Sequence, residues 1–180
     1  MLDKVGFKII DVELNDTNGG SFMIIAAKNE SPQKTNKEII AETMQKEKKT
    51  GVMDSAAFSK FKSNVTRHRK ELLTLLKTLK QNKKTVFGYG ASTKGNVILQ
   101  WCSITPNEIP FIAEVNDDKF GSFTPRTLIP IISEKQARAM KPDYFLVLPW
   151  HFRENIIEKE KEFRETGGKF IFPLPEIEIV

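Results

Sequence analysis

Two short runs near the start of the chain are predicted β-strands. Residues 7–14 mostly alternate between apolar and polar positions, residues 21–27 form a mainly apolar run, and the cluster of turn-forming residues at 15–20 separates them. The pattern predicts an antiparallel β-hairpin. Because a lone hairpin is only marginally stable in water, we expect it to need a covering surface.

Residues 34–81 show helical rather than strand periodicity. A short, very polar helix is predicted over 34–49, and Gly51 interrupts it. Asp54 or Ser55 can then cap a long helix that runs to about Gln81. We expect the apolar stripe of this helix to pack in the core; its members are Phe58, Phe61, Val65, Leu72, Leu75, Leu76 and Leu79.

From residue 84 onward, apolar runs alternate with amphipathic stretches. Strands are predicted at 85–90, 111–115, 144–148 and 169–172, helices at about 94–102, 133–140 and 151–166, and an edge strand at 177–180. This alternation is typical of a mostly parallel sheet flanked by helices. The predicted fold is therefore Rossmann-like α/β, preceded by a β-hairpin and a long helix, with divisions at 1–30, 31–83 and 84–180.

Composition narrows the class of protein. The chain has 180 residues, 39% of them hydrophobic, and no apolar run of the roughly 18 residues that a membrane span needs. Its first residues do not resemble a signal peptide, and the single Cys102 suits a reducing compartment, so we expect a cytoplasmic protein. One cysteine and two distant histidines make no recognisable zinc site.

The chain is basic, with a formal net charge of +5. Between Lys60 and Lys84 the only acid is Glu71, so an anionic ligand is favoured in general. Nucleic-acid binding has little support, because this segment carries no known binding motif. The charge is better interpreted as the solvated face of an amphipathic helix, although a protein-interaction module built on this helix stays an alternative.

A glycine-rich segment follows the first strand of the α/β region and opens its first helix. Glycines allow a ligand to approach the backbone closely, and a helix start presents N–H groups and a positive dipole end to phosphate. Lys94 would oppose that dipole unless an anion joined it. The segment therefore predicts an anion site made of Gly88, Gly90, Ser92, Thr93, Lys94 and Asn96, with Gly95 giving space.

Two standard phosphate motifs fail in detail in this segment. The dinucleotide fingerprint needs a third glycine where Thr93 stands, and the P-loop needs a lysine where Asn96 stands. A small NAD(P)-dependent oxidoreductase is thus an alternative and not the leading hypothesis, and an ATPase is disfavoured. A tight strand-to-helix turn without a ligand also remains open.

Other candidate residues follow the neighbouring strands at the same predicted edge of the sheet, where doubly wound proteins bind ligands. Asn116 and Asp117 can hold a ribose hydroxyl or simply form a turn. Trp150 can stack on a base or sugar, and His151 can bind a phosphate or lie beside a helix cap. No nucleophilic triad can be assembled, so no catalytic residue is assigned.

Several ordered blocks together resemble one family. Residues 88–96, 112–119, 123–125 with 129–131, and 144–152 are similar to the C-terminal domain of S-adenosylmethionine-dependent sugar C-methyltransferases. The segments 5–13 and 19–22 resemble the closing hairpin of that family's methyltransferase domain, and the long basic helix resembles its interdomain connector. Asn18 departs from the histidine that is usual there, which puts any role of that position in doubt.

The resemblance implies a role for this chain in deoxysugar biosynthesis. In that family a nucleotide-linked sugar, typically a dTDP-keto-deoxysugar, lies between the middle and C-terminal domains. Zinc, S-adenosylmethionine and the catalytic residues belong to the other domains. The chain thus looks like the C-terminal portion of such an enzyme, excised or naturally short, with no cofactor of its own and inactive alone. Its expected partners are a nucleotide sugar and either a separate methyltransferase domain or a second copy.

Overall fold

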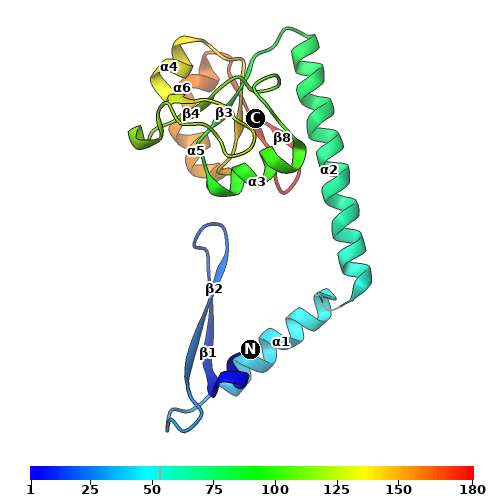
Figure 1. The fold of residues 1–180 in the computed structure, drawn as a ribbon, viewed down its shortest axis with the longest axis vertical. Coiled ribbons are helices and arrows are strands. Elements are labelled where there is room, and N and C mark those ends of the chain that lie inside the picture. The colour runs from blue at the N-terminus through cyan, green and yellow to red at the C-terminus, as the bar shows by residue number, and fades with distance from the viewer. Residues whose placement is uncertain (53) are drawn as a thin grey trace. The chain divides into compact units, whose positions relative to one another are not determined.

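The computed structural model describes residues 1–52 and 54–180 (Figure 1). These residues form two compact units, Met1–Ser63 (unit 1) and Asn64–Val180 (unit 2). The three-part division at 30 and 83 stays a prediction. Within the part of the chain that the structure describes, no helix combines the length and the hydrophobicity that a bilayer crossing requires.

Unit 1 contains the predicted hairpin and a polar helix. Its elements are the 3₁₀ turn η1 (Leu2–Val5), the antiparallel strands β1 (Phe7–Asn15) and β2 (Ser21–Lys28), α1 (Lys37–Thr50) and the start of α2 (Ser55–Gln81). The side chain of Asn36 caps α1, and its N–H donates to the carbonyl of Ile10 at 2.8 Å, which ties α1 to β1. Gly51, with a φ of 70°, ends α1 in the left-handed conformation that glycine tolerates.

The described part of unit 1 contains no buried core. Among its described residues, 1–52 and 54–63, none is buried. The expectation that Phe58 and Phe61 pack in a core is wrong, because 65% and 66% of their surfaces are exposed. Helical spacing identifies which residues share a face of α2, but it cannot say where along the helix a partner surface ends.

Unit 2 is built on a six-stranded sheet in the order β5-β4-β3-β6-β7-β8. All neighbouring strands are parallel except β7 and β8, which are antiparallel. This is the strand order of a doubly wound Rossmann fold. The strands are β3 (Val86–Tyr89), β4 (Ile112–Glu114), β5 (Ile131–Ser133), β6 (Tyr144–Val147), β7 (Lys169–Phe172) and β8 (Glu178–Ile179).

Helices cover both faces of this sheet (Figure 1). The buried side of α2, with Leu72, Leu76 and Leu79, packs with α3 (Thr93–Cys102) on one face. On the other face lie α4 (Glu134–Ala139), α5 (Arg153–Lys159) and α6 (Lys161–Glu165). Two short 3₁₀ turns, η2 (Asp117–Lys119) and η3 (Trp150–Phe152), follow β4 and β6.

The single helix predicted over 151–166 is divided in two at Glu160. The backbone of Glu160 leaves helical geometry, with φ −102° and ψ 28°. Its side chain is turned into the interior, where it meets Tyr89 and Arg138. The buried polar contact therefore accompanies a break that the charged sequence pattern did not reveal. The predicted start of the preceding helix near residue 133 is confirmed, because Ser133 and Gln136 form a capping box on α4.

Candidate functional site

The topological switch point of the sheet lies between β3 and β6. Each of these strands connects to a helix on a different face, so their carboxyl ends form the crevice where doubly wound folds bind ligands. Leu148 N–H donates to the carbonyl of Tyr89 at 3.0 Å. A Cβ on Gly90 would lie only 2.9 Å from the ring of Pro149. The loop after β3 and the loop after β6 are thus in direct contact.

The glycines of the first loop are required by close packing within the protein. A Cβ on Gly88 would meet Ile112 Cδ1 at 2.3 Å, and one on Gly95 would meet Leu148 Cβ at 2.4 Å. Gly90 has a φ of +76°, which disfavours any side chain. Gly95 therefore performs the helix-to-strand packing of the fingerprint's third glycine, two residues beyond Thr93.

Ser92 starts α3 as its cap. Its Oγ accepts the N–H of Gly95 at 3.0 Å, and its carbonyl accepts the N–H of Asn96 at 3.1 Å. The hydroxyl predicted to contact a ligand is therefore used in shaping the turn. Thr93 and Lys94 are exposed in the first helical turn. Thr93 is the first helical residue, so its N–H has no acceptor within the helix.

His151 is brought to the same place by the loop after β6. Its Nδ1 is buried and has no hydrogen-bond partner among the described residues. Burial and the positive charge of Lys94 lower the pKa of His151 below its ordinary value. The two loops thus place the imidazole of His151 in the electrostatic field of the Lys94 ammonium group. Trp150 is half-buried and packs against the hydrophobic clusters on both faces of the sheet.

Asn116 and Asp117 follow β4, as predicted, but Asn116 is occupied within the turn. Its Oδ1 accepts the N–H of Asp118 at 3.0 Å and caps η2. The carboxylate of Asp117 is in an exposed residue of the same turn. The structure thus gives Asn116 the turn-forming role that the sequence had left open, and its contact with a ligand stays a prediction.

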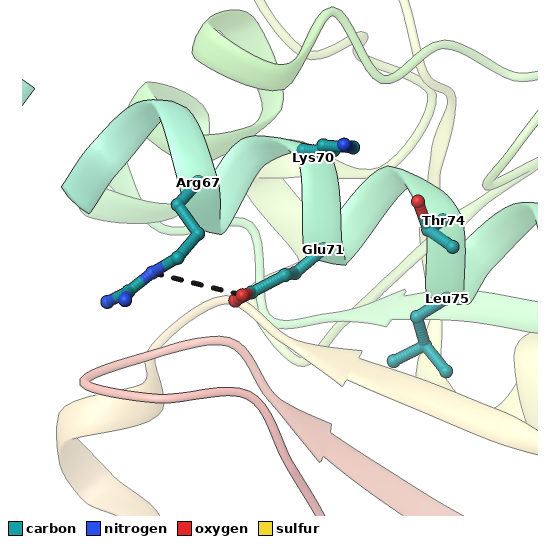
Figure 2. A pocket seen from close by; sticks show the side chains of 5 residues that line it. All are labelled: Arg67, Lys70, Glu71, Thr74 and Leu75. Carbon is teal, nitrogen blue, oxygen red and sulfur yellow. Dashed lines mark ion pairs between the residues drawn. The ribbon is translucent and has the colours of Figure 1, made fainter. Parts of the chain in front are cut away.

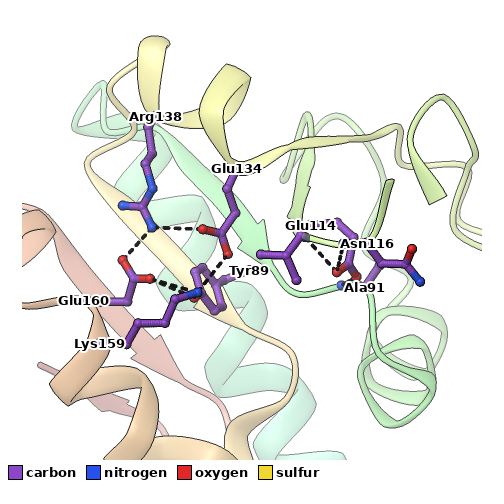
Figure 3. Close-up of polar contacts among 9 residues, drawn as sticks. Tyr89, Ala91, Glu114, Asn116, Glu134, Arg138, Lys159 and Glu160 are labelled. Atoms are coloured by element: carbon purple, nitrogen blue, oxygen red, sulfur yellow. Dashed lines mark hydrogen bonds and ion pairs between the residues drawn. The ribbon is translucent and has the colours of Figure 1, made fainter. Parts of the chain in front are cut away.

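Glu114 is a residue of this region that the sequence analysis missed. It is only 6% exposed, and its carboxylate accepts four hydrogen bonds. Figure 3 shows Ala91 and Asn116 beside it. Oε2 takes the Ala91 N–H at 2.9 Å and Lys119 Nζ at 3.1 Å, and Oε1 takes the N–H groups of Val115 and Asn116 at 2.8 and 3.0 Å. Burial alone raises the pKa of Glu114, but these bonds outweigh it and the pKa is lowered.

An acid inside an apolar strand is the sequence signal that could have identified Glu114. A buried charge is costly unless it is paired and hydrogen-bonded, so a glutamate between Ala113 and Val115 implies nearby donors. The identity of those donors depends on the tertiary fold. Ala91 comes from a different loop, and no local pattern indicates that its N–H faces Glu114.

A second buried polar cluster lies on the α4 and α5 side of the sheet (Figure 3). The Tyr89 hydroxyl donates to Glu160 Oε1 at 2.9 Å, and Arg138 Nη2 contacts Glu160 Oε2 at 2.5 Å and Glu134 Oε2 at 3.3 Å. Burial, followed by the negative charges of Glu134 and Glu160, raises the pKa of Tyr89 well above its ordinary value. Tyr89 therefore stays a donor and anchors the end of β3 directly before Gly90.

The basic side of α2 has a separate hollow of about 500 Å³ (Figure 2). It is lined by Arg67, Lys70, Glu71, Thr74 and Leu75, with Arg67 Nε 3.8 Å from Glu71 Oε1. None of the predicted site residues is in this set. All five lining residues come from one helix, and the pair across the hollow is exposed, so the geometry there is that of a helix surface.

Comparison with known proteins decides the family. A family model described as the C-methyltransferase C-terminal domain matches residues 16–175. The chain belongs to this family. The C-methyltransferase NovU of Streptomyces niveus is 34% identical to it over 183 aligned residues, which cover all of this chain. The resemblance to a C-methyltransferase C-terminal domain, drawn from the ordered sequence blocks, is thereby confirmed.

The C-methyltransferase C-terminal domain seen here accounts for only part of its relative. The chain spans 43% of the length of NovU. The match begins at residue 16, in the turn that follows β1, so it includes β2 and α1 as well as the sheet of unit 2. The described residues hold no cluster of three or more His, Cys, Asp or Glu side chains placed to bind a metal ion.

Proposed function

We propose that this chain is the nucleotide-sugar-binding portion of an S-adenosylmethionine-dependent sugar C-methyltransferase acting in cytoplasmic deoxysugar biosynthesis. Its membership of the C-methyltransferase C-terminal domain family supports the general assignment. The observation that carries the binding role is the meeting of two loops at the β3/β6 switch point. There the first turn of α3, with Lys94, lies within electrostatic reach of the His151 ring.

In this proposal different loops bind different parts of the ligand. The backbone around Gly88 and Gly90, with Thr93 and Lys94, holds the pyrophosphate, because a helix start and an ammonium group both favour an anion. Ser92 and Asn96 stabilise the conformation of this turn. The nucleotide and sugar lie against the predicted residues of the neighbouring loops, which are Asn116, Asp117, Trp150 and His151.

Glu114 makes the oxidoreductase alternative weaker. In dinucleotide-binding folds an acid after the second strand accepts hydrogen bonds from the adenosine ribose. Glu114 ends that strand, but its carboxylate already accepts four internal donors. The third position of the fingerprint is also occupied by Thr93. A nucleotide sugar bound mainly through its pyrophosphate suits this arrangement better than a dinucleotide.

The exposed apolar surface of unit 1 supports a further protein partner. Phe22, Met23 and Ile24 of β2 are 65%, 45% and 43% exposed. A strand that is apolar on consecutive residues is typical of one covered on both faces. We infer that unit 1 docks on a methyltransferase domain, which would supply the S-adenosylmethionine site, or on a second copy of the chain. Methyl transfer is therefore not expected from these residues alone.

Calorimetric titration tests the binding role. We expect the chain to bind dTDP and a dTDP-sugar with a Kd below about 1 mM, and Lys94→Ala to weaken binding at least tenfold by removing the charge at the anion seat. Lys46→Ala, in exposed α1, serves as the charge-matched control and should bind as the wild type does. S-adenosylmethionine should give no binding heat.

Absence of binding to dTDP, UDP or GDP sugars at millimolar concentration, with an intact circular dichroism spectrum, would overturn the binding role. Saturable S-adenosylmethionine binding would instead contradict the assignment of the methyl-donor site to another domain.

A further inference from the structure

Glu114 stands where a ligand-binding acid is expected but faces the protein. It ends β4, the strand beside β3, at the edge where the glycine-rich loop begins. An ionised carboxylate has about four acceptor positions. The Glu114 carboxylate accepts two donors on each oxygen, and all four donors belong to this chain. Little acceptor capacity is left for a bound molecule.

The contacts of Glu114 Oε2 hold one residue of the loop, Ala91. Its Oε2 accepts the N–H of Ala91, while Lys119 Nζ, bound to the same oxygen, donates to the Ala91 carbonyl at 3.1 Å. Ala91 is thus clamped on both sides. It connects Gly90, in the left-handed conformation, to Ser92, the cap of α3. The orientation of this residue sets the direction in which the chain enters the helix.

We propose that Glu114 is a positioning residue for the anion seat: it fixes the loop at Ala91 and does not itself touch the ligand. This inference rests on the proposed function, because it concerns the same seat. Glu114 acts through backbone geometry, holding the Gly90–Thr93 turn in the shape that presents the first N–H groups of α3 to phosphate. The partly buried Lys119 assists by neutralising the carboxylate.

Whether Glu114→Gln weakens or strengthens ligand binding distinguishes a positioning role from a purely electrostatic one. Glu114→Gln removes a negative charge near an anion, and the loss of Coulomb repulsion alone would then strengthen binding. Positioning predicts the reverse, because the glutamine amide has one acceptor oxygen for two pairs of donors and no charge to hold Lys119, so the contact that fixes Ala91 is weakened. Asp118→Asn is the matched control, since it removes the same charge from an exposed side chain of the adjacent turn.

The experiment is a calorimetric titration of the full chain with inorganic pyrophosphate, dUDP and UDP. Glu114→Gln should weaken the binding of all three by a similar factor of at least ten, because the loop and not the nucleoside has changed. Asp118→Asn should bind all three as well as the wild type or slightly more tightly. Unchanged affinity in a folded Glu114→Gln variant would overturn the proposal. A loss of affinity for UDP alone would also overturn it, because that would mean that Glu114 binds the ribose 2′-hydroxyl.

A second variant keeps the test decisive if Glu114→Gln does not fold. Glu114→Asp retains the charge but is one methylene shorter, so it should lose its reach to Ala91 and weaken pyrophosphate binding at least fivefold. Equal affinity of this variant and the wild type would contradict the positioning role. Failure of the wild type to bind any of the three ligands would instead remove the proposed function, a result that is distinguishable from either variant's behaviour.

Discussion

Replacing Gly95 with valine is expected to destabilise unit 2 by about 3 kcal/mol or more. A Cβ at this position would lie 2.4 Å from Leu148 Cβ, which cannot move without its backbone, and 2.9 Å from Ser92 Oγ, which is held as the cap of α3. Overpacking of a core costs about 1–3 kcal/mol, and the loss of a helix cap costs about 1 kcal/mol more. In thermal unfolding, the midpoint should fall by roughly 10 °C or more.

Val97→Ala is the control for the Gly95 substitution. Val97 lies on the same helix but is 66% exposed, so its truncation should change the free energy of unfolding by less than about 0.5 kcal/mol. A Gly95→Val variant that melts within 2–3 °C of the wild type would show that α3 does not pack against Leu148 as closely as the structure has it.

When the two units are produced as separate fragments, we expect only unit 2 to unfold cooperatively. The fragment 1–63 is expected to show no cooperative unfolding transition, because none of its described residues is buried. Half-buried apolar side chains alone offset too little of a backbone ordering cost of about 1–2 kcal/mol per residue. The fragment 64–180 should unfold cooperatively, since it contains both buried clusters, including Leu72, Leu76 and Leu79.

Circular dichroism and calorimetry of the two fragments check this prediction. The melting temperature of fragment 64–180 should lie within a few degrees of that of the whole chain. A sharp, two-state transition for fragment 1–63 in dilute solution would contradict it, and would also remove the argument that unit 1 requires a docking partner.

Much of the fold could be predicted from local pattern. The apolar runs and amphipathic stretches after residue 84 indicated an α/β fold, and the parallel sheet and flanking helices confirm it. Strong local signals located the caps: Gly51 ends α1, and Ser133 starts α4. The hairpin was predicted for the same reason, because its turn residues and alternation are local properties of the sequence.

The errors and omissions came from properties that depend on distant contacts. Phe58 and Phe61 share the apolar face of α2 but are exposed, because periodicity does not specify how far a partner surface extends. The break at Glu160 accompanies its contacts with Tyr89 and Arg138, which lie 71 and 22 residues away in sequence.

The candidate site was predicted in part. Sequence placed the glycine-rich loop and the segment containing His151 at one edge, and the structure brings these two together through Gly90 and Pro149. It did not identify Glu114, because the relevant donors come from another loop. The side chains of Ser92 and Asn116, two candidate ligand contacts, cap helical turns, and their contact with a ligand stays a prediction.

The central claim is that an anionic nucleotide binds at the first turn of α3, between the loops that follow β3 and β6. Two-dimensional NMR of the ¹⁵N-labelled chain during titration with dTDP tests it most directly. The account predicts that the largest saturable shifts occur in the backbone amides of residues 90–96 and of Trp150 and His151. Shifts centred on residues 67–75 of α2, or no shifts at millimolar dTDP, would contradict it.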